Sequence, residues 1–476
     1  MATELRNFLS LSYEELEEMN LHAKDQRKKR VPVHKVQEER LKYLRDEKRI
    51  KAVTVLFTDL EGRLHMLDYD KKFLLGSWDN LTFDGSSIRG FTAQRESDLR
   101  LAMDWGAFYW GPADIFGGGK VLVFGHVIDK DGSPYKADIR GVLNSYAETL
   151  QKKEGYTLNA ANEIEGFLFK GTDAERHYQE TGKFEYVNTG GYYHSLPGDL
   201  LRTFIDTTAE VQRSMGFQNE KDHPEVAPSQ FEINYSYGEV VSAADRIQLY
   251  KLICRQVATK MGLTASFLPK PVVGVNGSGM HTNVSISKDG KNLFWDAKGD
   301  EKLSKLGWSF VDRILTHGND ICLLLNPSVN AFRRLDPHFE APNQIKASPV
   351  DRGSMIRIPI GNEKSMRVEV RSVAPDANPY MVMYGIFKTG LEGDTSKIKN
   401  LRQAERYLPD NIYTALENYR NADWTTKLFG EDVKARYGDL KQASADRCAR
   451  LLGTFVKAPE VQYHHEVYNQ FLWNLF

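Results

Sequence analysis

The segment EIEGFLF, residues 163–169, sets the strongest constraint on how this chain can fold. It reads as a β-strand, and the two-residue period of a strand places Glu163 and Glu165 on one face, beside Phe167 and Phe169. Two like charges among aromatic rings are unfavourable unless cations neutralise them. The sequence therefore predicts that this strand faces positive groups or bound cations.

Later segments supply more groups of the same kind. Four further candidates lie in HPEVAPSQFEINY, NGSGMHTNVS and RVEVR: Glu225, Glu232, His281 and Glu369. Five carboxylates and one imidazole suit two hard divalent cations, Mg²⁺ or Mn²⁺, whereas zinc prefers more His or Cys. A set of structural salt bridges is the alternative interpretation of the same residues.

Arginines gather in the same third of the chain as Glu369: Arg333, Arg334, Arg352, Arg357, Arg367 and Arg371. The strand period places Arg367, Glu369 and Arg371 on one face. Arginines beside metal-binding carboxylates suit phosphoryl transfer, in which positioning and charge neutralisation carry most of the catalysis. The glycine stretch FGGGK is not a Walker loop, because Val121 follows the lysine where that loop needs Ser or Thr.

The chain divides into a β-rich part and a longer mixed part. Residues 51–69 predict a hairpin that turns around Asp59 and Gly62, and residues 121–128 predict another strand. Helix is predicted at three places: residues 1–50, where Ser12 and Glu15 form a capping box, residues 243–262, and most of residues 408–476. Residues 50–130 therefore form a small β-rich domain.

Composition restricts the partners and the compartment. Lys plus Arg is 63 and Asp plus Glu is 64 among 476 residues, so no charge excess favours nucleic acid or an anionic membrane surface. The sequence contains no run of 18 or more apolar residues, and its N-terminus is acidic rather than signal-like. Three cysteines are too few for a disulfide framework, which favours a reducing, cytoplasmic setting.

Eight motifs in a fixed order resemble the glutamine synthetases, in particular their prokaryotic type I-like branch. The motifs are FDGSSIRGF, EIEGFLF, EVAPSQFEIN, NGSGMHTNVS, NPSVNAFRRL, FEAP, IRIP and RVEVR…ANPY, and they span roughly residues 50–395. The resemblance implies an α+β fold, with a small N-terminal β-grasp domain followed by a large catalytic α/β domain. We expect a helical extension at 1–49, the β-grasp domain at 50–130 and the catalytic domain at 131–476.

The resemblance also implies an activity, the ATP-dependent ligation of L-glutamate and ammonia through γ-glutamyl phosphate. It implies a homo-oligomer, a dodecamer of two stacked hexameric rings with active sites between subunits. By the family pattern, Glu165, Glu225 and Glu232 hold the first metal ion. The second metal ion is held by Glu163, His281 and Glu369.

The resemblance also implies the remaining site residues. Glutamate is expected to bind Asn276, Gly277, Arg334 and Arg371. The nucleotide is expected to contact Glu220, Ser285, Arg357, Lys364 and Arg367. Arg352 stabilises the transferring phosphoryl group, the flap residue Glu340 closes the site and takes a proton, Asp84 binds ammonium, and Tyr192 lies near that ammonium.

The sequence departs from the family at a few positions. Asn283 stands where most relatives have a second histidine, so a neutral amide replaces a group that can be cationic beside ATP. Val373 and Ala374 replace a usual Pro-Asp pair. Two rival functions stay open, a glutamate–amine ligase and a non-catalytic structural relative. Asp84 favours ammonia over an amine, and the presence of all six metal-ligand candidates favours catalysis.

Overall fold

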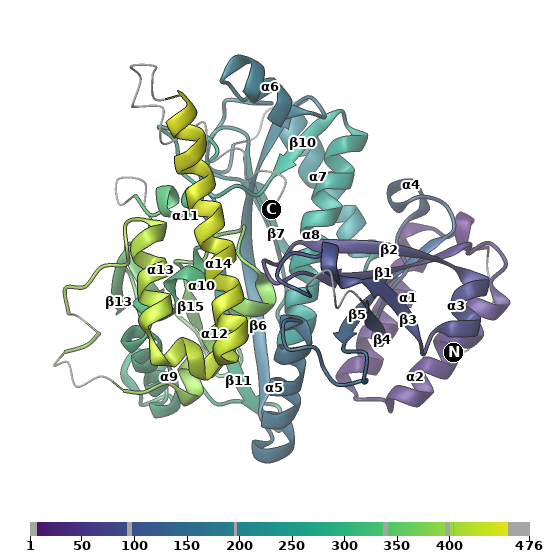
Figure 1. Ribbon diagram of the computed structural model, residues 1–476, viewed down its shortest axis with the longest axis horizontal. Coiled ribbons are helices and arrows are strands. Elements are labelled where there is room, and N and C mark those ends of the chain that lie inside the picture. Colours follow the sequence, from purple (N-terminus) through teal and green to yellow (C-terminus); the bar gives the residue numbers. More distant parts are fainter. Residues whose placement is uncertain are drawn as a thin grey trace.

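The computed structural model describes residues 7–92, 98–194, 198–336, 341–395, 400–402 and 404–455, with the side chains of 448–455 excepted. The expected flap residue Glu340 and the chain beyond residue 455 lie outside these ranges. Figure 1 shows the first sheet and its helices on one side of the molecule, and the strands β11 and β15 with helices α9 to α14 on the other. No helix in the described ranges has the length and apolar character needed to cross a lipid bilayer.

The smaller sheet has the strand order β2-β1-β5-β4-β3. Its strands are β1 (Ala52–Thr58), β2 (Leu64–Asp70), β3 (Leu81–Asp84), β4 (Asp98–Tyr109) and β5 (Lys120–Ile128). β1 and β2 form the antiparallel hairpin that the sequence predicts, and its turn uses Gly62 at φ +89°. β1 and β5 run parallel, while the other pairs in this sheet are antiparallel. The strand predicted at 121–128 is confirmed.

Two helices precede the small sheet and pack on it: α1 (Tyr13–Lys28) and α2 (Val33–Asp46). The capping box at the start of α1 is confirmed, with Ser12 and Glu15 each accepting from the backbone N–H of the other. In the middle of α1, the buried Asn20 donates to the carbonyl oxygens of Trp110 and Ser214 at 2.9 and 2.8 Å. It also accepts from the backbone N–H of Trp110 at 3.0 Å. One amide thus joins α1 to both halves of the molecule.

The larger sheet has the order β13-β14-β15-β11-β6-β8-β7, with β9, β10 and β12 on its margins. Every pairing is antiparallel except β13 with β14. The strands are β6 (Thr157–Lys170), β7 (Asn219–Pro224), β8 (Gln230–Tyr235), β9 (Gly238–Glu239), β10 (Leu263–Ser266), β11 (Met280–Lys288), β12 (Lys291–Asn292), β13 (Gln344–Ser348), β14 (Ser354–Arg357) and β15 (Val368–Val370). The expected strand at 163–169 therefore lies within β6, in the interior of the sheet.

Helices cover this sheet and connect it to the small one. Those of eight or more residues are α5 (Ile139–Glu154), α6 (Ala174–Thr181), α7 (Leu200–Ser214), α8 (Val240–Lys260), α9 (Lys305–Thr316), α10 (Gly318–Leu325), α12 (Pro379–Glu392), α13 (Ile412–Asn421) and α14 (Asp423–Phe455). The shorter ones are α3 (Lys71–Ser77), α4 (Ala113–Phe116) and α11 (Val329–Arg334). The long helix predicted at 243–262 is confirmed as α8. The helical C-terminal part is confirmed as far as residue 455.

A buried ion network ties the two halves together. The Arg140 guanidinium donates to both carboxylate oxygens of Asp245 at 2.8 Å and to Asp104 at 2.8 Å. Arg27 of α1 lies 3.7 Å from Asp104 and 3.8 Å from Asp245. Tyr380 of α12 donates to Asp245 at 2.7 Å. Four helices and strand β4 therefore converge on two carboxylates, of which Asp245 is fully buried and Asp104 partly so.

We expect Asp245→Ala to lower the free energy of unfolding by about 3–5 kcal/mol, because it removes the fully buried carboxylate that pairs with the fully buried Arg140. The matched control is Glu180→Ala, which breaks the exposed helical pair of Arg176 and Glu180. Its unfolding free energy should stay close to that of the unchanged protein. Denaturant unfolding followed by circular dichroism measures both. Equal effects of the two substitutions would contradict the assigned role of the network.

Candidate active site

One face of the large sheet collects the acidic residues because of its register. His281 of β11 lies opposite Glu163 of β6, and Glu165 of β6 lies opposite Glu232 of β8. On the other side of β11, Asn283 lies opposite Glu369 of β15. Directly opposite residues, and residues two apart along a strand, point to the same face. We call this the site face, and it confirms the predicted common face of Glu163 and Glu165.

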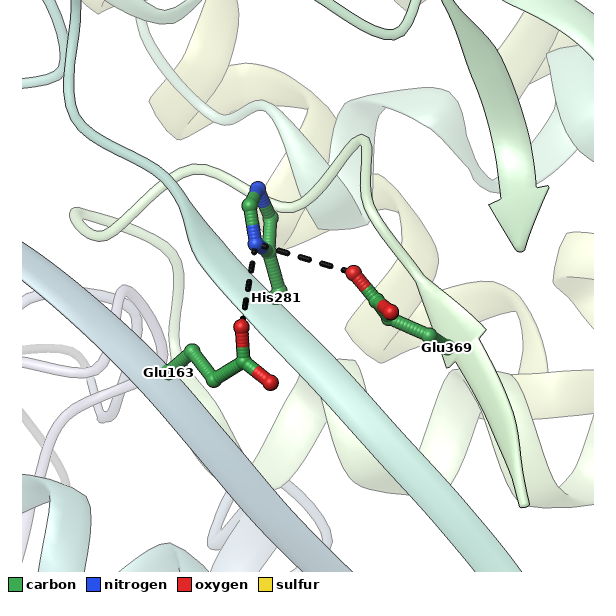
Figure 2. A group of neighbouring side chains, drawn as sticks. All are labelled: Glu163, His281 and Glu369. Carbon is green, nitrogen blue, oxygen red and sulfur yellow. Dashed lines mark ion pairs between the residues drawn. The ribbon is translucent and has the colours of Figure 1, made fainter. Parts of the chain in front are cut away.

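One group of ligand atoms, from Glu163, His281 and Glu369, lies at the centre of the site face (Figure 2). Nδ1 of His281 is 3.6 Å from Oε2 of Glu163 and 3.7 Å from Oε1 of Glu369. The three ligand atoms lie within 4.8 Å of one another, and the Glu369 side chain is buried. Burial on its own would raise the pKa of Glu163, but hydrogen bonding and the charge of His281 lower it to about 2. Glu163 therefore stays ionised at neutral pH.

Another group combines His223, Glu225 and Glu232, and its three ligand atoms again lie within 4.8 Å of one another. Nδ1 of His223 is 3.4 Å from Glu225, and its Nε2 is 3.5 Å from Glu232. Burial, together with the negative charge of Glu232, raises the pKa of Glu225 to about 7. Burial also raises the pKa of Glu165, helped by Glu225 and Glu232. The raised pKa values show that these carboxyl groups favour a bound proton or another cation at close range.

The sequence pattern does not single out His223, although it stands two residues before Glu225 in HPEVAPSQFEINY. Its partner across β7 and β8 is Glu232, nine positions further along the chain. The two-residue period of a single strand cannot predict this pairing, because a turn separates the two residues. Both groups are rich in carboxylate oxygens with one imidazole each, so their donor sets fit the expected Mg²⁺ or Mn²⁺.

The arginines surround Glu369 and Glu165. Arg371 donates to Glu369 at 2.6 Å, and Arg357 lies 3.1 Å from its other oxygen. Arg334 is buried and donates to the carbonyl oxygen of Arg371 at 3.0 Å. Burial lowers the pKa of Arg334 to about 10, against the charge of Glu165, so its guanidinium remains charged at neutral pH. Positive groups thus surround Glu369 and Glu165, as the sequence predicts.

The glycines of NGSGMHTNVS allow this close approach. A Cβ at Gly279 would lie 2.5 Å from Nη2 of Arg334 and 3.0 Å from Nε2 of His281. A Cβ at Gly277 would lie 2.5 Å from the carbonyl oxygen of Pro269. Gly279 also donates its N–H to Glu165 at 2.8 Å. Because glycine has no side chain, a backbone N–H donor, a histidine and an arginine can lie close together here.

Asn283 bridges the metal-ligand candidates and the arginines. Its side-chain NH₂ donates to Glu163 at 3.1 Å, and its amide oxygen accepts from Nε of Arg367 at 2.9 Å. The neutral amide that departs from the family pattern is therefore a link between Glu163 and Arg367, two residues with separate expected roles. It uses both its donor and its acceptor, which a charged side chain would do less well.

The other expected site residues take varied positions. Tyr192 is half-exposed and lies edge-on to the His223 ring at 5.4 Å. Asn276 and Ser285 are partly buried, while Glu220, Arg352 and Lys364 are exposed. Asp84 is also exposed and ends β3 in the small sheet. Among the described residues, neither group of ligand atoms includes Asp84.

The chain matches two family models, "Glutamine synthetase, beta-Grasp domain" over residues 49–130 and "Glutamine synthetase, catalytic domain" over residues 136–454. A glutamine synthetase of Methanosarcina mazei is 36% identical over 423 residues, covering 84% of this chain and 92% of the relative. One of Staphylococcus aureus is 34% identical over 439 residues, covering 87% and 96%.

Two solved structures share the fold. A Plasmodium falciparum glutamine synthetase has a TM-score of 0.76 at 20% identity, covering 87% of this chain and 96% of that one. A structure described as apo GmaS without ligand has a TM-score of 0.71 at 24% identity, covering 83% and 93%. These matches confirm the expected α+β architecture with a β-grasp domain and a catalytic domain.

We expect the affinity for Mn²⁺ to rise as the pH increases through about 7. Below that pH Glu225 carries a proton that a metal ion must displace, because the pKa of Glu225 is raised to about 7. Titration calorimetry at pH 6 and pH 8, in buffers of different ionisation enthalpy, should show tighter binding at pH 8 and proton release at pH 6. Glu225→Gln should bind Mn²⁺ weakly at both values. Equal affinities in the unchanged protein would contradict this assignment.

Proposed function

This chain belongs to the glutamine synthetase family of ligases, and we propose that it joins L-glutamate and ammonia to form L-glutamine with ATP. In the proposed reaction ATP phosphorylates the γ-carboxylate of glutamate, and ammonia displaces the phosphate. The observation that carries this proposal is the pair of ligand groups side by side on the site face, bordered by arginines. Phosphoryl transfer needs such a concentration of positive charge around the transferring group.

Two divalent ions, Mg²⁺ or Mn²⁺, would supply charge neutralisation for the phosphate oxygens when bound. Glu165, Glu225 and Glu232 would hold the first, and Glu163, His281 and Glu369 the second. Three observations support these ligand sets. Glu163 is ionised, Glu369 is fixed between two arginines, and Gly279 orients one oxygen of Glu165.

Glutamate would bind between Arg334, Arg371 and the backbone at Asn276 and Gly277. Arg334 is prepositioned because it donates to the carbonyl oxygens of Arg371 and Val373 at 3.0 and 3.2 Å. A guanidinium held by neutral acceptors keeps its charge available to a carboxylate.

The nucleotide would lie beside the second metal ion, in contact with a set of mainly polar and charged side chains: Glu220, Ser285, Arg357, Lys364 and Arg367. Arg357 lies 3.1 Å from Glu369, and Arg367 is held by Asn283. Arg352 would stabilise the transferring phosphoryl group, and Glu340 would exclude water and take a proton.

Asp84 would bind ammonium and take its proton, which frees the lone pair that attacks the acyl phosphate. Hydrogen bonds from Ser86 at 2.8 Å (N–H) and 2.6 Å (hydroxyl) lower the pKa of the Asp84 carboxyl, so it is ionised at neutral pH. Tyr192 would line the same site. Because Asp84 lies in the small sheet, we infer that it acts in the site of a neighbouring subunit, within a dodecamer of two stacked hexameric rings.

The domain division at 1–49, 50–130 and 131–476 is part of this proposal, and so is the cytoplasm as the compartment. Cys254 and Cys322 are buried free thiols, which is consistent with a reducing environment.

Asp84→Asn is expected to cut glutamine formation at least about tenfold while glutamate-dependent ATP cleavage persists, because general acid–base groups contribute about 10²–10⁴-fold. The control is Asp131→Asn. Asp131 is another exposed carboxylate that accepts from the N–H and hydroxyl of the serine two residues on, at 2.9 and 2.7 Å. Both variants disturb a similar turn, but only Asp84 has an expected chemical role.

The assay compares ammonium with methylamine, ethylamine and polyamines as the nucleophile. A higher kcat/KM with an amine would replace this proposal by a glutamate–amine ligase. Absence of glutamate-dependent ATP cleavage with every nucleophile would favour the non-catalytic relative.

Asn283→Leu, which keeps the size but removes both hydrogen bonds, should raise the KM for ATP by about 10-fold or more, in line with the loss of an outer-shell partner. Its kcat should change less, because the phosphoryl contacts assigned to Arg352 are unaltered. The control is Ser287→Ala, four residues further along the site face of β11, where the hydroxyl accepts from Asn159. Fluorescence titration with a nucleotide analogue separates the binding effect from turnover, and an unchanged nucleotide affinity in Asn283→Leu would be the contrary result.

A further inference from the structure

We propose that Glu61 is a positioning residue that fixes the chain segment carrying Asp84. We call this segment, residues 84–92, the Asp84 loop. Glu61 holds the loop through Arg89, and Lys441 of α14 holds Glu61 from the other side. The proposal rests on the ammonium-binding role proposed for Asp84, and it adds to that role side chains that contact no substrate.

The Glu61 carboxylate pairs with a cation at each of its two oxygens. Nε of Arg89 lies 2.6 Å from Oε2, and Nζ of Lys441 donates to Oε1 at 2.6 Å. The side chains of Glu61 and Lys441 are 7% and 2% exposed, so water screens their pair less than a surface salt bridge. Burial on its own would raise the pKa of Glu61, but the charges of Lys441 and Arg89 lower it. The carboxylate is therefore ionised at neutral pH and attracts both cations.

The turn between β1 and β2 keeps Glu61 itself in place. The carbonyl oxygen of Leu60 accepts from the side-chain amide of Asn378 at 3.1 Å. That of Gly62 accepts from the side-chain amide of Gln248 at 2.8 Å. A Cβ at Gly62 would lie 2.5 Å from the Cα of Asn378, so the turn lies directly against the N-terminus of α12. Glu61 is therefore fixed to the larger half of the molecule through both of its neighbours.

The far end of the Asp84 loop also docks on α14. A Cβ at Gly90 would lie 2.7 Å from Cβ of Leu60 and 3.0 Å from Cδ1 of Leu440, and Gly90 has a φ of +79°. The next residue, Phe91, is buried, and its carbonyl oxygen accepts from Nη1 of Arg436 at 2.6 Å. Leu440 and Arg436 belong to α14. The helix therefore holds the end of the loop by direct contact and its middle through Glu61.

These contacts act on Asp84 because local hydrogen bonds already fix its carboxylate within the loop. It accepts from the N–H and the hydroxyl of Ser86, and from the hydroxyl of Ser87 at 3.2 Å. The loop then needs a fixed position relative to the rest of the molecule, which the pairs of Glu61 supply. A displacement of about 1 Å at a reacting group can cost about 10²-fold in rate, so a small shift of the loop has a measurable effect.

The alternative is a salt bridge that stabilises the fold and does nothing more. Asp68 and Lys120 form a pair of that kind between β2 and β5 of the same sheet, and neither residue belongs to the Asp84 loop. Loss of either salt bridge can lower the melting temperature. Only loss of the pairs at Glu61 should change how the protein uses ammonium.

Arg89→Met and Lys441→Met each remove one partner of Glu61 and leave the other. We expect both to raise the KM for ammonium at least about tenfold, because Asp84 is displaced, while the KM values for glutamate and ATP change much less. Arg89→Lys, which keeps a cation beside Glu61, should restore most of the ammonium affinity. Lys120→Met is the control and should keep the ammonium KM of the unchanged protein. An unchanged ammonium KM in the folded variants, or an equal rise of all three KM values, would overturn the proposal.

Hydrogen exchange followed by mass spectrometry separates this proposal from the proposed function. Peptides that cover residues 84–92 should exchange faster in Arg89→Met and Lys441→Met than in the unchanged protein, and Lys120→Met should leave them unchanged. Equal exchange of the loop in all four proteins would show that Glu61 does not hold it. If the unchanged protein forms no glutamine from ammonium but its loop is released in both Met variants at Arg89 and Lys441, the proposed function fails and the positioning of the loop by Glu61 stands.

Discussion

The pairing of Glu163 with His281 across β6 and β11 is the central pairing of the site face, because both strands carry ligand candidates toward the same side. Each of the two strands then pairs with a further strand, so that Glu165 faces Glu232 on one side and Asn283 faces Glu369 on the other. A slip of one residue would turn the whole set toward the helices. The carboxylates repel one another, so the register is stable only because arginines, histidines and bound protons offset their charge.

The opposite face of β6 supplies the support. Ile164, between the two glutamates, is fully buried on that side, and its carbonyl oxygen accepts from Tyr250 of α8 at 3.1 Å. The same helix carries Asp245, which accepts hydrogen bonds from Arg140 and Tyr380 and forms an ion pair with Arg27. One helix therefore connects the ion network between the halves to the strand that holds the ligands. The precision of the site depends on groups that never contact a substrate.

The sequence alone predicts those features of the site that depend on the alternation of side chains along a single strand. The alternation in EIEGFLF correctly places Glu163 and Glu165 on one face, and RVEVR correctly brings Arg371 onto Glu369. His223 could not be found this way, because its pairing with Glu232 depends on a turn whose register the residues do not reveal. The bridge made by Asn283 joins β11 to β6 and to the residue before β15, and its partners Glu163 and Arg367 lie 120 and 84 residues away in the sequence. Such contacts follow from sheet order rather than from local pattern.

The amide of Asn20 has a consequence for how the chain reaches its native state. Its partners at Trp110 and Ser214 are 90 and 194 residues away. Asn20 also donates to the carbonyl oxygen of Leu16 within α1 at 3.0 Å, but its two other acceptors lie just after β4 and at the end of α7, so these bonds form only when all three segments meet. Closing loops of this length is entropically unfavourable and slows folding. The docking of α1 therefore depends on partners that are distant in the sequence, and once formed it joins the two halves of the molecule.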